Sequence, residues 1–258
     1  MFGHALADTD SDFGQAMSYF HCLLRTLPID HVERRNIYYY LGRIYRFIEK
    51  FDESLNCFRC ARLLVHRLLP DRMFDYCRIL GGMGTIYSHL EDSERALKLL
   101  TQVLMLQKKS LPKNHTEIPF HLNRLAHAYF MVKQYCLALS ILDSAEKFFQ
   151  TKMSVDHQGY AFTLHTMSLV YRALGDDKKA LIHFQETLHI RYSSLGKNHP
   201  LLASTYYQLG LIHYDRAEYE IALDYVRKSL NIQLIKLPHY HSELNLSREL
   251  FRRLQQHQ

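Results

Sequence analysis

Histidine is the residue whose spacing in this sequence comes closest to a chemical motif. Seventeen histidines occur among 258 residues, and five of them share one position of a 42-residue interval: His31, His115, His157, His199 and His241. Zinc needs its ligands within about 2 Å of one ion, whereas copies on successive helices would lie about 8–10 Å apart. We therefore predict that these imidazoles cap or brace the loop before a helix, in agreement with Pro200 directly after His199. No metal or other cofactor is expected, although the neighbouring His239 and His241 leave adventitious metal binding open.

Two other short motifs are weaker candidates for chemistry. Cys57 and Cys60 form a CxxC, but both fall within one predicted helix, and no second cysteine or histidine pair accompanies them. The Gly-Gly-Met-Gly run at 81–84 lacks the preceding strand and the following lysine of a phosphate loop. We interpret it as a helical segment that allows close helix contact, with a flexible joint as the alternative. Since no catalytic motif occurs elsewhere, we predict that the chain is not an enzyme.

The elements that carry these residues repeat along the chain. Residues 197–230 contain an amphipathic helix, a polar turn and a second amphipathic helix, and the same residue types recur upstream in steps of 42. Two columns of the repeat hold small residues, namely Gly42, Gly84, Ala126, Ser168 and Gly210, and Ser54, Ala96, Ala138, Ala180 and Ala222. Small residues let one helix approach another closely. A helix pair that repeats without insertion is typical of an all-α solenoid.

Five full helix pairs are predicted within residues 29–238 of a single domain. The first helices cover about 33–47, 74–89, 116–131, 158–173 and 200–215, and the second helices 51–68, 93–109, 135–151, 177–193 and 219–235. Residues 1–28 are predicted to hold a shortened repeat, with a remnant helix at 1–7 and a helix at 13–24. Residues 239–258 should form a capping helix, about 242–256, with Leu246, Leu250 and Leu254 on its inner face. Because Met1 stands in a helical pattern without a polar cap, we expect an upstream segment to be missing.

Composition restricts the class of partner. The net charge of +6 is modest and favours acidic partners, but no run of lysine and arginine is typical of nucleic-acid or lipid binding. Asp8, Asp10 and Asp12 occupy the place of a signal-peptide core, and no apolar run approaches the ~18 residues that span a bilayer. Five cysteines, an odd number, favour reduced and buried thiols. We predict a cytoplasmic protein that binds neither nucleic acid nor membrane.

The repeated columns resemble those of the tetratricopeptide repeat family. The pattern Leu-Gly-x-x-Tyr occurs at 41–45, and an aromatic residue followed by Ala-Leu occurs at 219–223. The 42-residue interval and the loop LGKNHP at 195–200 are similar to the kinesin light chain subclass. This resemblance implies a right-handed superhelix of antiparallel helix pairs, whose first helices line a concave groove that binds peptides.

Function is therefore expected on the first helices, where groove-facing positions combine arginine, asparagine and aromatic residues. The predicted peptide-binding residues are Tyr39, Arg43, Arg46, Arg78, Asn123, Arg124, His127, Phe130, His165, Arg172, Tyr207 and Tyr214. Arginine pairs with carboxylates, asparagine holds backbone amides, and aromatic rings receive apolar side chains. We predict a non-catalytic scaffold that binds an acidic protein segment with apolar anchors. The alternatives are an accessory array of a larger enzyme or motor adaptor, an RNA-binding repeat, or ordinary solvated residues at these positions.

Overall fold

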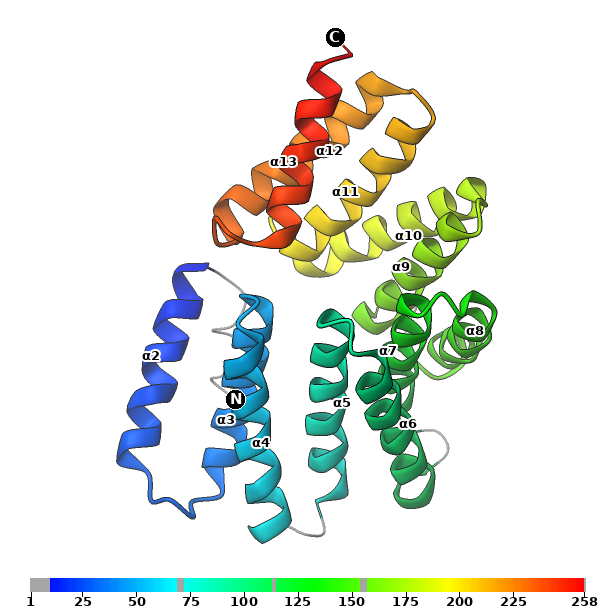
Figure 1. Ribbon diagram of the computed structural model, residues 1–258. Helices are drawn as coiled ribbons and strands as arrows, with labels where there is room; N and C mark the ends of the chain where they lie inside the picture. Colours follow the sequence, from blue (N-terminus) through cyan, green and yellow to red (C-terminus); the bar gives the residue numbers. More distant parts are fainter. Residues whose placement is uncertain (1–9, 69–71, 113–114, 154–156, 258) are drawn as a thin grey trace. The chain divides into compact units, whose positions relative to one another are not determined.

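The computed structural model describes residues 10–68, 72–112, 115–153 and 157–257, which form twelve α-helices and no strand (Figure 1). The helices are α2 (Asp10–Thr26), α3 (Glu33–Phe47), α4 (Phe51–Leu68), α5 (Met73–His89), α6 (Ser93–Ser110), α7 (Ile118–Met131), α8 (Tyr135–Lys152), α9 (Gln158–Ala173), α10 (Asp177–Leu195), α11 (Pro200–Asp215), α12 (Tyr219–Lys236) and α13 (Ser242–Gln255). The predicted all-α fold is confirmed. None of the described helices is both long and apolar enough to cross a lipid bilayer.

The repeat predicted most helix boundaries correctly. All ten helices of the five pairs, and the capping helix, begin and end within two residues of their predicted positions. The exception is α2, which begins at Asp10 rather than Phe13. The predicted remnant helix at residues 1–7 lies outside the described residues.

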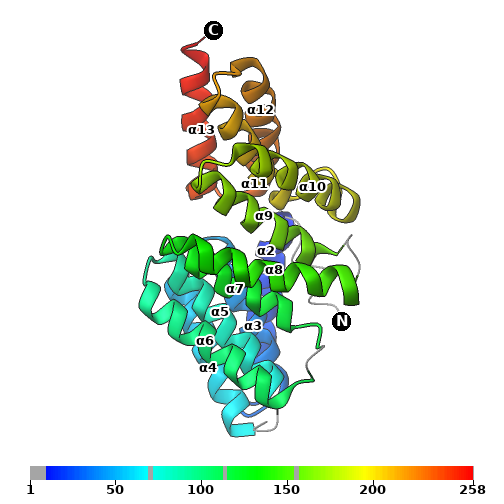
Figure 2. The same cartoon turned by 90° about the vertical axis from the view of Figure 1, so that its right-hand side faces the viewer.

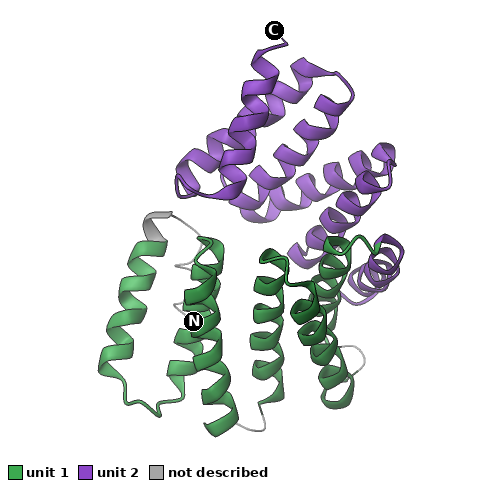
Figure 3. Cartoon of the chain, viewed as in Figure 1, with its two compact units in different colours: residues 1–134 green, residues 135–258 purple. Residues whose placement is uncertain are grey.

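The chain divides into two compact units, Met1–Gln134 and Tyr135–Gln258 (Figure 3). Unit 1 contains α2 to α7 and unit 2 contains α8 to α13. Within each unit, every helix packs against the next one along the chain (Figures 1 and 2). In unit 1 the alternate helices α3, α5 and α7 also touch one another in a row. This row positions the candidate site described below.

The two small columns lie where paired helices approach each other. Every residue of both columns is buried, and Ser54 Oγ of α4 donates a hydrogen bond to the Gly42 carbonyl of α3 at 2.5 Å. A Cβ atom on Gly42 would lie 3.1 Å from the Phe58 ring, and one on Gly210 would lie 2.8 Å from a methyl group of Val226. Both distances are shorter than ordinary van der Waals contact, so these positions require small residues.

The turn after each first helix repeats with the same backbone geometry. One residue per turn has a positive φ, and these residues recur every 42 positions: Glu49, Glu91, Lys133, Gly175 and Ala217. The N–H of the following residue bonds to a helix carbonyl five positions earlier, for example Lys50 to Tyr45 at 2.8 Å. This is the Schellman arrangement that closes a helix C-terminus. Only Gly175 among the five is the glycine usual at such a position, so residue type alone did not indicate the positive φ.

Two predictions about side-chain burial were wrong. Leu246 was predicted to face inward but is 52% exposed, whereas Leu244 and Ser247 are fully buried. The reason is that α13 packs against both α11 and α12, and Ser247 Oγ comes within 3.5 Å of Ser229 Oγ of α12 at the close contact. The five cysteines were predicted to be buried, but Cys77 alone is buried; Cys57 and Cys60 are half-buried, and Cys22 and Cys136 are exposed.

Candidate functional site

The five histidines of the repeated column cap or brace the starts of the helices that follow them, as predicted. In each case Nδ1 accepts a hydrogen bond from the backbone N–H two residues later, at 3.2 Å from Glu33, 3.3 Å from Glu117, 2.9 Å from Gly159, 3.2 Å from Leu201 and 3.2 Å from Glu243. An imidazole accepts at Nδ1 when it is neutral with its proton on Nε2. Burial lowers the pKa of His157 and so favours that neutral form. Across the described residues, no group of three histidine, cysteine or acidic side chains could hold a metal ion.

The predicted site residues of unit 1 come together on α3, α5 and α7. We call the surface that bears Arg43 and Arg46 of α3, Arg78 of α5 and Arg124 of α7 the arginine face. Arg43 is exposed, and the other three are partly buried. Tyr39 of α3 lies among them, because the guanidinium carbon of Arg78 is 4.5 Å from its ring centroid and Arg78 also hydrogen-bonds to its side chain. Three adjacent helices thus present one cationic surface.

The charges of the arginine face are close enough to perturb one another. Burial, together with the charges on Arg124 and Arg43, lowers the pKa of Arg46 to about 10. Burial raises the pKa of Tyr39, but the charges on Arg78, Arg124 and Arg43 outweigh it and leave that pKa below its usual value. Among the described residues, no carboxylate forms an ion pair with any of the four arginines. A bound anion would therefore relieve a repulsion that the free protein retains.

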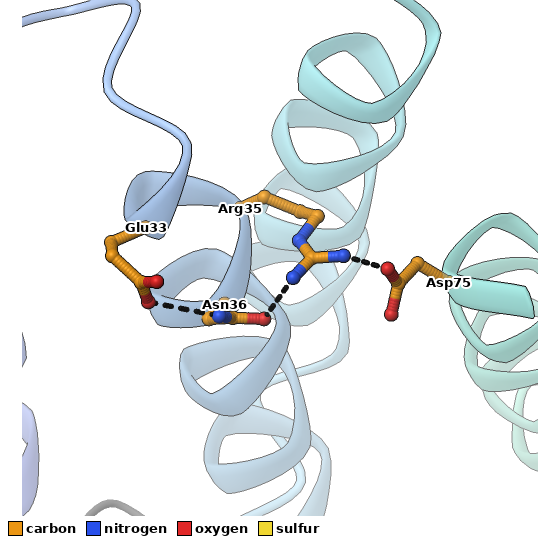
Figure 4. Close-up of polar contacts among 4 residues, drawn as sticks. All are labelled: Glu33, Arg35, Asn36 and Asp75. Carbon is orange, nitrogen blue, oxygen red and sulfur yellow. Dashed lines mark hydrogen bonds and ion pairs between the residues drawn. The ribbon is translucent and has the colours of Figure 1, made fainter. Parts of the chain in front are cut away.

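Arg35, a neighbouring arginine of α3, does have an ion-pair partner. Arg35 forms an ion pair with Asp75 of α5 and donates a hydrogen bond to Asn36 Oδ1 at 2.7 Å, while Asn36 donates to Glu33 at 2.9 Å (Figure 4). The same junction of α3 and α5 contains a small pocket lined by Arg35, Asn36, Tyr39, Asp75, Arg78 and Ile79. The ion pair with Asp75 offsets the charge of Arg35 and joins α3 to α5. Arg78 lies one turn after Asp75 on α5, and no carboxylate among the described residues forms an ion pair with it.

Two residues that the sequence did not indicate as site residues complete this surface. A Cβ atom on Gly81 of α5 would overlap Nη1 of Arg124, and it would lie 2.7 Å and 2.9 Å from Cε1 and Nδ1 of His121. The side chains of Arg124 and His121 therefore lie against the bare backbone of Gly81. His121 and Arg124 are three residues apart, which places both on one face of α7. The spacing alone did not indicate a site, because the sequence does not show that Gly81 packs against that face.

The other predicted residues of α7 extend the arginine face. Asn123 is only 1% exposed and lies beneath the surface. The His127 ring lies 6.1 Å from the Phe130 ring and 6.5 Å from the His89 ring of α5. Burial and the charge on Arg46 lower the pKa of His127 to about 4, so that it is neutral at pH 7. This end of the face is aromatic rather than charged.

Two predicted site residues, His165 and Arg172, lie on α9, and His165 is engaged within unit 2. His165 is 9% exposed, with its ring 5.3 Å from the Phe184 ring and its Nδ1 3.4 Å from Arg191 Nη1. Arg191 is itself buried and donates to the Leu201 carbonyl at 2.8 Å and to Thr205 Oγ1 at 2.6 Å. Burial lowers the pKa of Arg191 to about 10. His165 thus belongs to a buried polar cluster.

The remaining predicted residues of unit 2 are also engaged within the unit. Arg172 forms an ion pair with Asp215 at 2.8 Å and a hydrogen bond with Gln208 at 3.2 Å. Tyr207 and Tyr214 pack against the apolar cluster formed with α12 and α13. Unit 2 therefore has no counterpart of the arginine face among the predicted residues that the structure describes.

Several solved structures have a similar fold. BtubC (BKLC) from P. vanneervenii is 18% identical with a TM-score of 0.62 over 82% of each chain. A Podosopora anserina putative kinesin light chain with nearly identical TPR-like repeats is 19% identical, with a TM-score of 0.54 over 79% of this chain and 96% of that one. A Rap protein complexed with competence and sporulation factor is 15% identical, with a TM-score of 0.72 over 92% of this chain and 68% of that one. At such identities the likeness shows the fold alone.

Sequence comparison identifies the family. The RxLR effector protein SFI4 of Phytophthora infestans (strain T30-4) is 22% identical over 148 residues, which are 57% of this chain and 44% of the effector, so the chain spans less than half of that relative. The family model described as tetratricopeptide repeat matches residues 30–109 and 117–193, and a second model with that description matches 202–237. These matches cover the helix pairs and the small columns, and they confirm the predicted resemblance. The chain belongs to the tetratricopeptide repeat family.

Proposed function

We propose that unit 1 binds an acidic segment of a partner protein across the arginine face. Domains of this family generally bind proteins and are typically non-catalytic. The observation that carries the proposal is the set of four arginines on adjacent helices for which no described carboxylate supplies an ion pair. Single surface arginines without a partner are common. Here burial and the charges on Arg124 and Arg43 lower the pKa of Arg46, and burial and the charges on Arg43 and Arg78 lower that of Arg124, so the four lie close enough to form one cationic site.

The chemistry of the arginine face favours carboxylates. A guanidinium offers a planar fork of donors that matches a carboxylate, and charge-assisted hydrogen bonds are about twice as strong as neutral ones. Arg46, Arg78 and Arg124 are already partly buried, so part of their desolvation cost is met in the free protein. An acidic segment would restore the missing counter-charge without a rearrangement of the helices.

Aromatic residues at the same surface support apolar anchors in the bound segment. Tyr39 stands at the centre of the face, and Phe130 lies at its far end beside His127. Both aromatic side chains are partly buried, which leaves part of each ring open to a ligand. The Rap structure, whose fold covers 92% of this chain, is itself complexed with a factor, which supports a binding role for this fold.

The experiment is a peptide-display selection on the full chain, with and without charge reversal of the arginine face. We expect the wild type to enrich acidic peptides and the double variant Arg78→Glu/Arg124→Glu to lose that enrichment. The matched control is Arg59→Glu/Lys108→Glu, which makes the same change in net charge at exposed positions of α4 and α6. Because partly exposed ion pairs are screened over about 8 Å at physiological ionic strength, binding should weaken as salt is raised.

Three results would contradict the proposal. One is an unchanged set of selected peptides in the arginine-face variant. Another is equal loss of acidic peptides in the control, which would indicate a general effect of net charge. The third is enrichment of RNA, but not of acidic peptides, in a parallel selection.

A further inference from the structure

A small pocket at the junction of α3 and α5 lies beside the arginine face. We call it the Asp75 pocket, and it is lined by Arg35, Asn36, Tyr39, Asp75, Arg78 and Ile79. The two helices run in the same direction, because the contact of Arg35 with Asp75 is followed one turn later by that of Tyr39 with Arg78. Since Tyr39 and Arg78 belong to both sites, a segment bound on the arginine face also reaches the Asp75 pocket.

The size of the pocket fits the end of one side chain. Its empty space is about 200 Å³ when the open mouth is included. Sites that enclose a whole small molecule have roughly 300–1,000 Å³. The side chains of Arg35 and Asp75 are only 12% and 13% exposed, so they line a recess rather than stand out on the surface. The pocket is therefore suited to be one subsite of a larger binding surface.

Asp75 supplies a hydrogen-bond acceptor to this pocket. Its Oδ2 accepts from Arg35 Nη1, and among the described residues no group donates to its Oδ1 (Figure 4). A carboxylate can accept about four hydrogen bonds in all. An acceptor with spare capacity inside a recess favours a ligand group that carries an N–H or O–H.

Arg78 and Asn36 supply donors to the same pocket. The guanidinium carbon of Arg78 lies 4.5 Å from the Tyr39 ring centroid and 5.5 Å from the Phe74 ring centroid, and contacts with two rings fix its direction. No described carboxylate forms an ion pair with Arg78. Asn36 Nδ2 donates to Glu33 at 2.9 Å, and its second N–H has no partner in the described part of the chain. The donors and the acceptor therefore line one small space.

A carboxamide carries both of the groups that this pocket can bind. The side chain of glutamine or asparagine has one carbonyl oxygen and one NH2 group. The carbonyl accepts from Arg78 or Asn36, while the NH2 group donates to Oδ1 of Asp75. A carboxylate only accepts, so it would place an oxygen against Asp75 with no proton between them. An ammonium group only donates, and Arg35 and Arg78 would repel it.

We propose that the Asp75 pocket selects a glutamine or asparagine side chain at one position of the acidic segment. This inference rests on the proposed function and adds to it a position that is not acidic. Carboxylates of the segment pair with Arg43, Arg46 and Arg124, and the carboxamide lies beside Asp75. Asp75 is then a specificity-determining residue, because it penalises a carboxylate at that position and so fixes the register of the segment on the surface.

The test is a substitution scan of the tightest acidic peptide from the display selection, labelled for fluorescence anisotropy and titrated with the full chain. Each peptide position is replaced in turn by glutamine, glutamate, asparagine, aspartate and methionine, so that each amide is compared with the acid of the same shape. At one position we expect one of the amides to bind about tenfold more tightly than its acid, which lacks the donor for Asp75. Methionine, which offers no N–H to Asp75, should also bind about tenfold more weakly than the amide there.

Asp75→Asn tests the acceptor without changing the shape of the side chain. The variant can donate to a carboxylate, so the preference for the amide should fall to about twofold or less. Asp52→Asn, at an exposed position of α4, makes the same change in net charge and should keep the preference. Because Asp75→Asn leaves Arg35 without its ion pair, circular dichroism and a melting curve check that the variant folds. The double variant Arg35→Gln/Asp75→Asn removes both charges together and should also lose the preference.

The outcomes separate this inference from the proposed function. If acidic peptides bind through Arg78 and Arg124 but no position prefers an amide to its acid, the Asp75 pocket assignment is wrong and the proposed function stands. Recognition of a main-chain amide alone would give that result. A preference that persists in Asp75→Asn, or in the double variant if the single variant does not fold, overturns the assignment as well. If no acidic peptide binds, the proposed function fails, and the inference fails with it.

Discussion

Replacing Gly82 by alanine should destabilise the protein, although alanine is the better helix former. A Cβ atom at position 82 would lie 2.7 Å from Cζ of the Phe58 ring, which is fully buried. Beyond its full burial, the ring is also in edge contact with Tyr39, at 5.8 Å between the ring centroids, so it cannot move aside without disturbing its neighbours. Overpacking of this kind costs about 1–3 kcal/mol. The gain in helix propensity recovers about 1 kcal/mol of that cost.

The assay is urea unfolding followed by far-ultraviolet circular dichroism, with Gly14→Ala as the reference. Gly14 is an exposed helical glycine with no neighbour near its Cβ position, so its substitution isolates the propensity gain of about 1 kcal/mol. We expect Gly82→Ala to be less stable than Gly14→Ala by about 1–3 kcal/mol. In a Phe58→Leu background the penalty of Gly82→Ala should disappear, because the ring edge that it meets is gone. Equal stability of Gly82→Ala and Gly14→Ala would refute this account of the contact between α4 and α5.

Three further predictions concern other polar groups. His199→Ala should cost about 0.5–2 kcal/mol of unfolding free energy, because it removes the acceptor for the Leu201 N–H, and an unchanged urea midpoint would show that the cap contributes nothing. The pKa of His127 is about 4 in the folded protein and about 6.5 in the unfolded chain, so the free energy of unfolding should fall as pH decreases from 6.5 toward 4. His127→Gln should reduce that fall by about 1–3 kcal/mol. An identical pH profile in the variant would contradict the lowered pKa of His127. Arg191→Ala should cost about 3–5 kcal/mol by leaving a cavity and unpaired acceptors, whereas Arg191→Met, which fills the volume, should cost less; equal losses in calorimetric melting would argue against a buried guanidinium.

The candidate site was predictable in part. The arginines of α3, α5 and α7 were identified from their offset to the small column, because a repeat of constant length carries one helix face through the chain. His165 and Arg172 stood at equivalent offsets, but the fold engages them with Arg191 and Asp215. Whether a side chain is open to a ligand depends on its partners on neighbouring helices, and the repeat pattern does not specify those partners.

The sequence by itself determined the helices, their close contacts and their histidine caps. Each of these features rests on local or periodic physics: apolar residues at helical spacing, small residues in a fixed column, and an imidazole that reaches a backbone N–H two residues away. Only the tertiary structure decided which charges are neutralised. Arg35 meets Asp75, and Arg124 meets Gly81, across 40 and 43 residues. Such contacts depend on how far one helix is translated and rotated against its neighbour. A shift of one helical turn between α3 and α5 would separate Arg35 from Asp75 and leave Arg35 without its ion pair.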